Sequence, residues 1–553
     1  MKKSKSLIWI PMALIGALML FLAGYELICS LTNYHGMQSV FASRFVGADN
    51  YAYVFQHSSF LRSLGNTFIQ GLMTILPSLA LGMGITCLLN LFRNRALKAA
   101  FAGGALLLVL VPTIVWEELM KNLIINVQSM FVSIGLLRRT GLIDSFSASW
   151  ALVLTNLIPM TCMIVFAGLT LSLSTGTPAW KSSLAVGFIP AMIMFLPDMR
   201  SLQLISNSMT QKNIQTTTYY IFQTGMMNMQ LGRAAAAGTV CRILCILIGL
   251  PASLLLGSIN KRAASLPRYR EEGKGWVSEM CIALGVAFLM LIIMLCSSIT
   301  SFFPIFTDKG VVSGTTNTIV IALLTALIAF VLCFLVITFS RHSRGGFAFA
   351  LLALLLMMLT TFLTTSRLTM VVLGLSNTAF GVALGSLGNP IFLAVLLLLA
   401  AQRPVTWRQT FFLAGGGALL AAACSAGDYL PAYLYTNSRD LQPLSLVFHN
   451  ILRSDSIMTS LDATGQFTPS EAINTTLRFF MTLIPLVIAL PGVALVMGGV
   501  GGTRWDAKKA TAAEEPVVLQ ALTELPAEPA QSFTDAAEQP AVEMPMPKEE
   551  FPQ

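Results

Sequence analysis

Long apolar runs alternate with short polar segments along most of this 553-residue chain. Each run is close to the roughly 20 residues that an α-helix needs to cross the hydrocarbon core of a bilayer. We therefore predict an all-α integral membrane protein with about twelve membrane-spanning helices. The predicted spans are residues 7–31, 65–91, 99–118, 149–173, 184–202, 234–258, 278–300, 314–340, 346–365, 378–401, 411–427 and 474–499.

The polar segments between these runs are of two kinds. Those at 92–98, 260–276, 341–344 and 402–409 are rich in Lys and Arg, and lysines also precede the first run. Basic loops stay on the cytoplasmic side of a membrane. We therefore predict a multi-pass protein with both termini in the cytoplasm and with its longer mixed loops outside. This topology accounts for the net charge of +9, so the charge does not indicate nucleic-acid binding.

The composition agrees with this class and excludes several others. Hydrophobic residues make up 55% of the chain and charged residues only 11%, whereas a soluble domain has about 25% charged residues. The nine cysteines lie in or beside apolar runs and the four histidines are scattered, so no metal site is predicted. The chain contains no phosphate-binding loop and no set of nucleophile, base and oxyanion donor. We therefore expect no enzyme activity and no cofactor, with any ATP bound by a partner subunit.

Two similar halves are indicated by the order of the motifs. Asn66-Thr67 and Asn317-Thr318 each open the second span of a six-span set, and the loops TPAWKSS and PVTWRQT occupy corresponding positions between spans four and five. Repeated halves are common in transporters. The predicted organisation is a first half at 1–258, a basic linker at 259–277, a second half at 278–499, and an acidic Pro/Glu/Ala-rich tail at 500–553, which is expected to be disordered.

Several phrases in this order resemble the permeases of carbohydrate-type ABC importers, the maltose and glycerol-phosphate kind. The first half carries FVGADNYAYVFQHSSFLRSLGNTF (45–68), LVPTIVWEELMKN (110–122) and YYIFQTGMMNMQLGRAAAAG (219–238); the second half matches more loosely at 425–448 and 475–499. The resemblance implies two fused permease halves with the transmembrane fold of type I ABC importers. It also implies a bacterial-type plasma membrane, an ABC ATPase dimer and an extracytoplasmic solute-binding protein as partners, and a sugar or sugar-like solute.

The loops that would couple such a permease to its ATPase depart from the family pattern. The family has Glu-Ala-Ala, three residues and then Gly, but the first loop here retains only Gly176 with Trp180 and Lys181, and the second only Trp407 and Arg408. These five residues are the candidate coupling residues. Alternatively, Trp beside a basic residue only marks the cytoplasmic membrane interface.

Candidate residues of a translocation path lie near the outer ends of spans five and eleven. Asp198 and Asp428 occupy matching positions there, and Tyr429 and Tyr433 follow the second carboxylate. Carboxylates accept hydrogen bonds from sugar hydroxyls and aromatic rings stack on sugars, but the same residues are also typical of a helix end at the membrane surface.

Three functions follow from these observations. The first is the permease component of a binding-protein-dependent ABC importer. The second is a degenerate permease homologue that acts as an accessory or scaffold membrane protein, because its coupling loops are short. The third is a secondary transporter, for which 6+6 spans are also typical.

Overall fold

The structure is a computed structural model, and it describes the all-helical core of the chain. The described residues are 24–36, 39–92, 95–134, 145–175, 183, 211–244, 247, 309–342, 374–401, 407–461 and 471–501. Within these ranges the regular structure is helical, apart from one isolated bridge between Thr32 and Phe45. The predicted linker at 259–277 and nearly all of the predicted tail at 500–553 lie outside the described residues.

Five of the described helices are long and apolar enough to cross a membrane, or up to seven if each of two bent helix pairs forms one span. This number agrees with a multi-pass all-α membrane protein. The number of described spans is smaller than the predicted twelve, and the count of twelve stays a prediction. The predicted spans at 184–202, 278–300 and 346–365, and most of the one at 7–31, fall outside the described residues.

The first half contains two long helices that pack against each other, α3 (Ser58–Asn90) and α6 (Ser145–Thr175). Each contains a proline, Pro77 and Pro159 respectively, which membrane helices tolerate because neighbouring groups can satisfy the freed carbonyls. Between them, α4 (Arg95–Val109) and α5 (Thr113–Ser133) form one of the bent pairs. The preceding loop contributes η1 (Val40–Ala42) and α2 (Asp49–Gln56).

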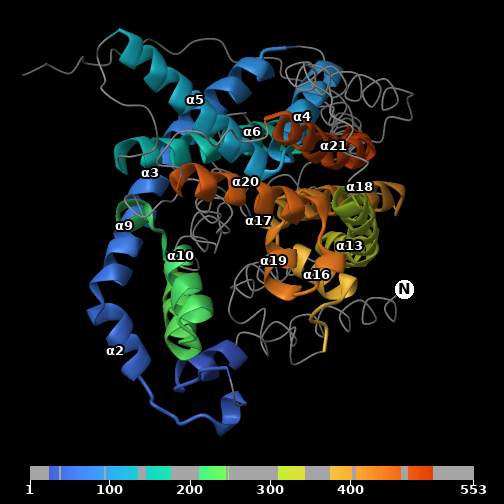
Figure 1. Cartoon of the computed structure of the whole chain (residues 1–553). Helices are drawn as coiled ribbons and strands as arrows, with labels where there is room; N and C mark the ends of the chain where they lie inside the picture. Colours follow the sequence, from blue (N-terminus) through green and yellow to red (C-terminus); the bar gives the residue numbers. More distant parts are fainter. Residues whose placement is uncertain are drawn as a thin grey trace, which may run out of the picture. The chain divides into compact units, whose positions relative to one another are not determined.

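The second half is built around α13 (Lys309–His342), α18 (Trp407–Gly427) and α21 (Glu471–Gly501), and α18 packs against both of the others (Figure 1). Glycines permit these close contacts. A Cβ at Gly416 would lie 2.7 Å from Val496 of α21, and one at Gly417 would lie 2.9 Å from the sulfur of Cys333 in α13. The other bent pair, α16 (Ala379–Ser386) and α17 (Pro390–Ala401), turns by 57°.

Short helices connect the long ones on the side that the charge pattern predicts to be extracytoplasmic. In the first half these are α9 (Gln211–Ile214), α10 (Thr217–Phe222) and the π-helix η2 (Gln223–Met227), followed by a helix at residues 231–244. In the second half they are α19 (Leu430–Tyr435), η4 (Arg439–Leu441) and α20 (Leu444–Leu461).

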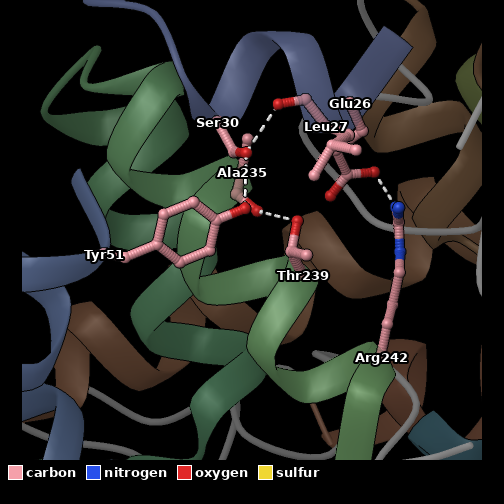
Figure 2. Close-up of polar contacts among 7 residues, drawn as sticks. All are labelled: Glu26, Leu27, Ser30, Tyr51, Ala235, Thr239 and Arg242. Carbon is pink, nitrogen blue, oxygen red and sulfur yellow. Dashed lines mark hydrogen bonds and ion pairs between the residues drawn. The ribbon is translucent and has the colours of Figure 1, made fainter. Parts of the chain in front are cut away.

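A buried polar network joins the helix at residues 24–30 to the helix at residues 231–244 (Figure 2). The carboxylate of Glu26 forms an ion pair with the guanidinium of Arg242, and both side chains are almost fully buried. Nearby, the hydroxyls of Ser30 and Tyr51 are 2.6 Å apart, and Asn50 donates to the carbonyls of Ser30 and Thr32 at 2.8 and 2.9 Å. Helix α2, which contains Asn50 and Tyr51, is thus attached to the segment at residues 30–32.

Candidate functional site

Near the start of α3, Asn66 and Thr67 hold the beginning of α10. The hydroxyl of Thr67 accepts a hydrogen bond from the backbone N–H of Thr217 at 3.0 Å, and the amide of Asn66 donates to the carbonyl of Gln215 at 3.1 Å. Thr67 is 4% exposed. We call Asn66 and Thr67 the first clamp.

Near the start of α13, Asn317 and Thr318 hold the beginning of α20 in the same way. The hydroxyl of Thr318 accepts a hydrogen bond from the N–H of Leu444 at 2.9 Å, and the amide of Asn317 donates to the carbonyls of Asp440 and Gln442 at 2.6 and 3.2 Å. We call Asn317 and Thr318 the second clamp.

The clamps supply something that the two clamped helices lack. The first N–H groups of a helix have no partner inside the helix and are commonly satisfied by the side chain that precedes it. Thr216 precedes α10 but makes no capping bond, and Pro443 precedes α20 and has no side-chain acceptor. A threonine from another helix therefore provides the missing acceptor in both cases.

The two clamps also have the same internal geometry. Each hydroxyl donates to the carbonyl four residues earlier in its own helix, Ser63 for Thr67 and Gly314 for Thr318, at 2.8 Å in both. A hydroxyl has one hydrogen and two lone pairs, so donating backwards leaves the oxygen free to accept the amide. In both clamps the asparagine donates to the carbonyl of a glutamine, Gln215 or Gln442. This glutamine lies two positions before the residue whose N–H the threonine accepts, Thr217 or Leu444.

Three aromatic side chains from α10, α19 and α20 meet beyond the clamps. The ring of Tyr433 lies 6.3 Å from that of Phe222 and 5.9 Å from that of His449, between centroids. Phe222 and His449 each stand five positions after the amide that a clamp binds. Tyr429 stacks on the other side of His449, with centroids 4.1 Å apart and planes inclined by 13°. We call Phe222, Tyr429, Tyr433 and His449 the aromatic junction.

Polar groups lie beside this junction. Arg453, one helical turn after His449 on α20, donates to the hydroxyl of Tyr433 at 3.4 Å. Burial raises the pKa of Tyr219, and the nearby Arg453 acts in the opposite direction. His449 is fully buried, and burial lowers its pKa to about 4, so its ring is neutral near pH 7. Phe222, Tyr429 and His449 are buried against other rings, whereas Tyr433 is partly exposed.

Asp428 lies at the end of α18 and is 4% exposed. One carboxylate oxygen accepts a hydrogen bond from the amide of Asn389 at 3.0 Å, and the other accepts one from the N–H of Leu430 at 3.1 Å. The side-chain oxygen of Asn389 in turn accepts the N–H of Ile391 at the start of α17. Asp428 thus connects the beginning of α19 to the break between α16 and α17, and its place on a translocation path stays a prediction.

The predicted coupling residues are only partly within the described chain. Trp407 is the first residue of α18, is about half exposed, and stacks on Phe334 of α13 with centroids 6.1 Å apart. The guanidinium carbon of Arg408 lies 5.4 Å from the ring centroid of Phe412. Gly176, Trp180 and Lys181, together with the predicted path residue Asp198, lie outside the described residues.

The structure brings together residues that the sequence did not single out. Tyr429 and Tyr433 were predicted as path residues, but Phe222, His449 and Arg453 were not. Two features could have pointed to them. His449 and Arg453 are one helical turn apart, and Phe222 follows the segment that the pair Asn66 and Thr67 binds. Of the described part of the chain, no group of His, Cys, Asp or Glu is arranged to hold a metal ion.

Comparison with known proteins gives a weak structural similarity. No known family model matches the chain, and no curated protein matches it. Among solved structures, it is similar to a chain of a bacterial ABC transporter involved in the import of the acidic polysaccharide alginate. The identity is 16% and the TM-score 0.34, and the match covers 46% of this chain and 96% of that one.

Proposed function

We propose that this chain is the membrane permease of a binding-protein-dependent ABC importer. It consists of two permease halves in one polypeptide in a bacterial-type plasma membrane. It passes a sugar or sugar-like solute inward, and a separate ABC ATPase dimer hydrolyses the ATP. An extracytoplasmic binding protein delivers the solute.

The observation that carries this proposal is the equivalence of the two clamps. Thr67 of α3 and Thr318 of α13 each accept the N–H of another helix and donate to the carbonyl four residues earlier in their own helix. Each clamp holds a short helix that contributes a ring to the aromatic junction. Equivalent elements from two halves that meet around one point are the arrangement that a repeated transporter needs at its path.

The chemistry of the junction supports a solute rich in hydroxyl groups. Tyr433 presents a ring between Phe222 and His449, and its hydroxyl is held by Arg453. Aromatic faces stack on the apolar faces of sugar rings, while hydroxyl and guanidinium groups hydrogen-bond to their edges. Of the predicted path residues, Tyr433 is the one that this arrangement supports most. Asp428 and Tyr429 belong to the residues around it.

We assign coupling to the ATPase to the ends of α13 and α18 that lie away from the aromatic junction. These are the C-terminal end of α13 and the N-terminal end of α18. Trp407 and Phe334 form a stacked, half-exposed aromatic surface at the first residue of α18, next to the basic Arg408. This surface could fill an apolar groove of the ATPase, and Arg408 could pair with an acidic group at its rim. Trp180 and Lys181 would do the same for the first half.

Capture of the full-length chain from its native membrane in mild detergent tests this function. An affinity-tagged chain is expected to bring down an ABC ATPase subunit, identified by mass spectrometry, and Trp407→Ala combined with Arg408→Ala should reduce the recovered ATPase. Phe380→Ala is the control, because Phe380 is an aromatic residue of α16 that is also about half exposed. If the ATPase is absent from the parent under all mild conditions, the accessory or scaffold role replaces the importer.

A further inference from the structure

We propose that the two clamps are equivalent positioning sites, one in each half, and that each fixes the first turn of the helix that carries one side of the aromatic junction. The proposal extends the proposed function, because it says which residues set the geometry of the path. It concerns Asn66 and Thr67 for α10, and Asn317 and Thr318 for α20.

Short helices need such a partner because they cannot hold themselves. α10 (six residues) continues into η2 (five residues), and the combined segment is still shorter than the roughly 12–15 residues at which an isolated helix becomes stable in water. Its first N–H groups would be unsatisfied without Thr67. The hydrogen bonds from Asn66 and Thr67 cross between segments that are about 150 positions apart in sequence, so they fix where α10 begins relative to α3.

α20 is longer, yet its first turn depends on the same contact. Pro443 fixes the backbone before it but offers no acceptor, so the N–H of Leu444 is satisfied by Thr318. The helices approach closely at this point, since a Cβ at Gly314 would lie 3.3 Å from backbone atoms of Leu444. Thr318 and Gly314 together therefore place the start of α20 directly on α13.

The clamps act on the junction through one short stretch of helix in each half. Phe222 lies at the end of α10 and His449 within the second turn of α20. Both rings contact Tyr433. A shift or fraying of the first turn in either helix would therefore change the spacing around Tyr433 from one side only.

Hydrogen–deuterium exchange of the full-length chain in detergent tests this proposal. Thr67→Val removes the acceptor with little change in shape, and should speed exchange in peptides that cover residues 211–222 by about fivefold, the factor expected for one neutral hydrogen bond. Peptides that cover residues 438–449 should be unchanged. Thr318→Val should give the reverse pattern.

Two sets of controls separate positioning from general stability. Thr67→Ser and Thr318→Ser keep the hydroxyl and should restore slow exchange. Thr74→Val and Thr315→Val remove threonines that bond to the carbonyl four residues earlier in the same two helices, at 2.8 Å each. These two variants should leave both peptides unchanged.

The proposal is overturned if Thr67→Val and Thr318→Val leave both peptides unchanged, or if each speeds exchange equally in both. If a valine variant cannot be purified, the serine variant still decides, because its failure to keep exchange slow would contradict a role for the hydroxyl. The readout needs neither a solute nor an ATPase. Its failure therefore leaves the importer proposal standing, and loss of the importer proposal leaves the clamps to be judged on exchange alone.

Discussion

The two clamps make the same hydrogen bonds, but the helices that carry them are stabilised by different kinds of contact. Around α3 close packing is joined by polar contacts. A Cβ at Gly82 would lie 2.7 Å from Ile164 of α6, and beside this contact Gln70 donates to the carbonyl of Ile214 at 3.2 Å and Ser78 to that of Leu157 on α6 at 3.3 Å. Around α13 the neighbours are close-packed small residues of α18, such as Gly417, with one polar contact between Thr325 and Ser425 at 3.1 Å.

This difference separates what the two halves share from what each does alone. Helices in a membrane associate through close packing of small residues or through polar contacts between them, and the two halves use these in different proportions. The contact between an Asn-Thr pair and the first turn of another helix, α10 or α20, is present in both. The shared contact is therefore the better indicator of a common function, and the surrounding packing reflects the stability of each half.

The largest effect is expected from the buried ion pair of the first half. Glu26→Gln leaves Arg242 buried beside an uncharged partner, and removing one member of a buried pair costs about 3–5 kcal/mol. We expect a corresponding loss in the free energy of unfolding, measured by denaturation in mixed micelles. The double variant Glu26→Gln with Arg242→Met should recover most of the loss, and a double variant no better than the single one would contradict the pairing.

Close packing of α18 on α21 should make the second half sensitive to added volume. Gly416→Ala would place a methyl group 2.7 Å from Val496 and 2.8 Å from the carbonyl of Gly492, and such overpacking costs about 1–3 kcal/mol. The neighbouring Gly415→Ala meets only Leu495 at 3.6 Å and should be neutral or slightly stabilising. Thermal unfolding in detergent compares the two, and equal stabilities would contradict close packing of α18 on α21.

A smaller effect is expected when a residue beside the first clamp is replaced by the residue found at the corresponding position beside the second clamp. Position 70 in α3 corresponds to Ile321 in α13 when the clamp threonines are aligned. Gln70→Ile removes one hydrogen bond to Ile214 and should cost about 1 kcal/mol. Exchange in residues 211–222 should stay slow, because Thr67 remains. Fast exchange there would show that Gln70, and not the clamp, fixes α10.

An effect that appears only on acidification concerns the ring that differs between the halves, Phe222 in one and His449 in the other. Burial lowers the pKa of His449 to about 4, so the folded state favours the neutral ring, and its contribution is complete above the unfolded pKa of about 6.5. Stability should therefore fall as the pH is lowered from about 6.5 towards 4. Arg453, which also disfavours the charged ring, lies on the same helix. His449→Phe should reduce this pH dependence.

The helical class and the Asn-Thr pairs could be predicted from the sequence, because membrane helices are long and apolar and because a repeated pair of polar residues at the start of an apolar run is visible by inspection. Their role could not be predicted. The partners of Thr67 and Thr318 are backbone amides about 150 and 126 positions away, and a backbone amide has no signature in a sequence.

The residues of the aromatic junction could be predicted only in part. Tyr429 and Tyr433 follow a carboxylate near a span end, which drew attention to them. Phe222 and His449 meet Tyr433 only through the packing of α10, α19 and α20. Asp428 was predicted to face either the path or the membrane surface, and neither alternative is tested. Its carboxylate accepts hydrogen bonds from Asn389 and Leu430 in a buried position, which the sequence did not indicate. Which neighbours satisfy a buried carboxylate depends on three-dimensional packing.

The most direct test of the account is whether the two halves meet at Tyr433. In the full-length chain, Phe222→Cys and Tyr433→Cys would be treated with a short bifunctional thiol reagent in the native membrane, and the linked peptides identified by mass spectrometry. Phe222→Cys with Trp407→Cys is the control, because Trp407 is expected on the opposite side of the membrane. We expect a linked pair of residues 222 and 433 and no linked pair for the control. Absence of the first pair, or equal yields of both, would contradict it.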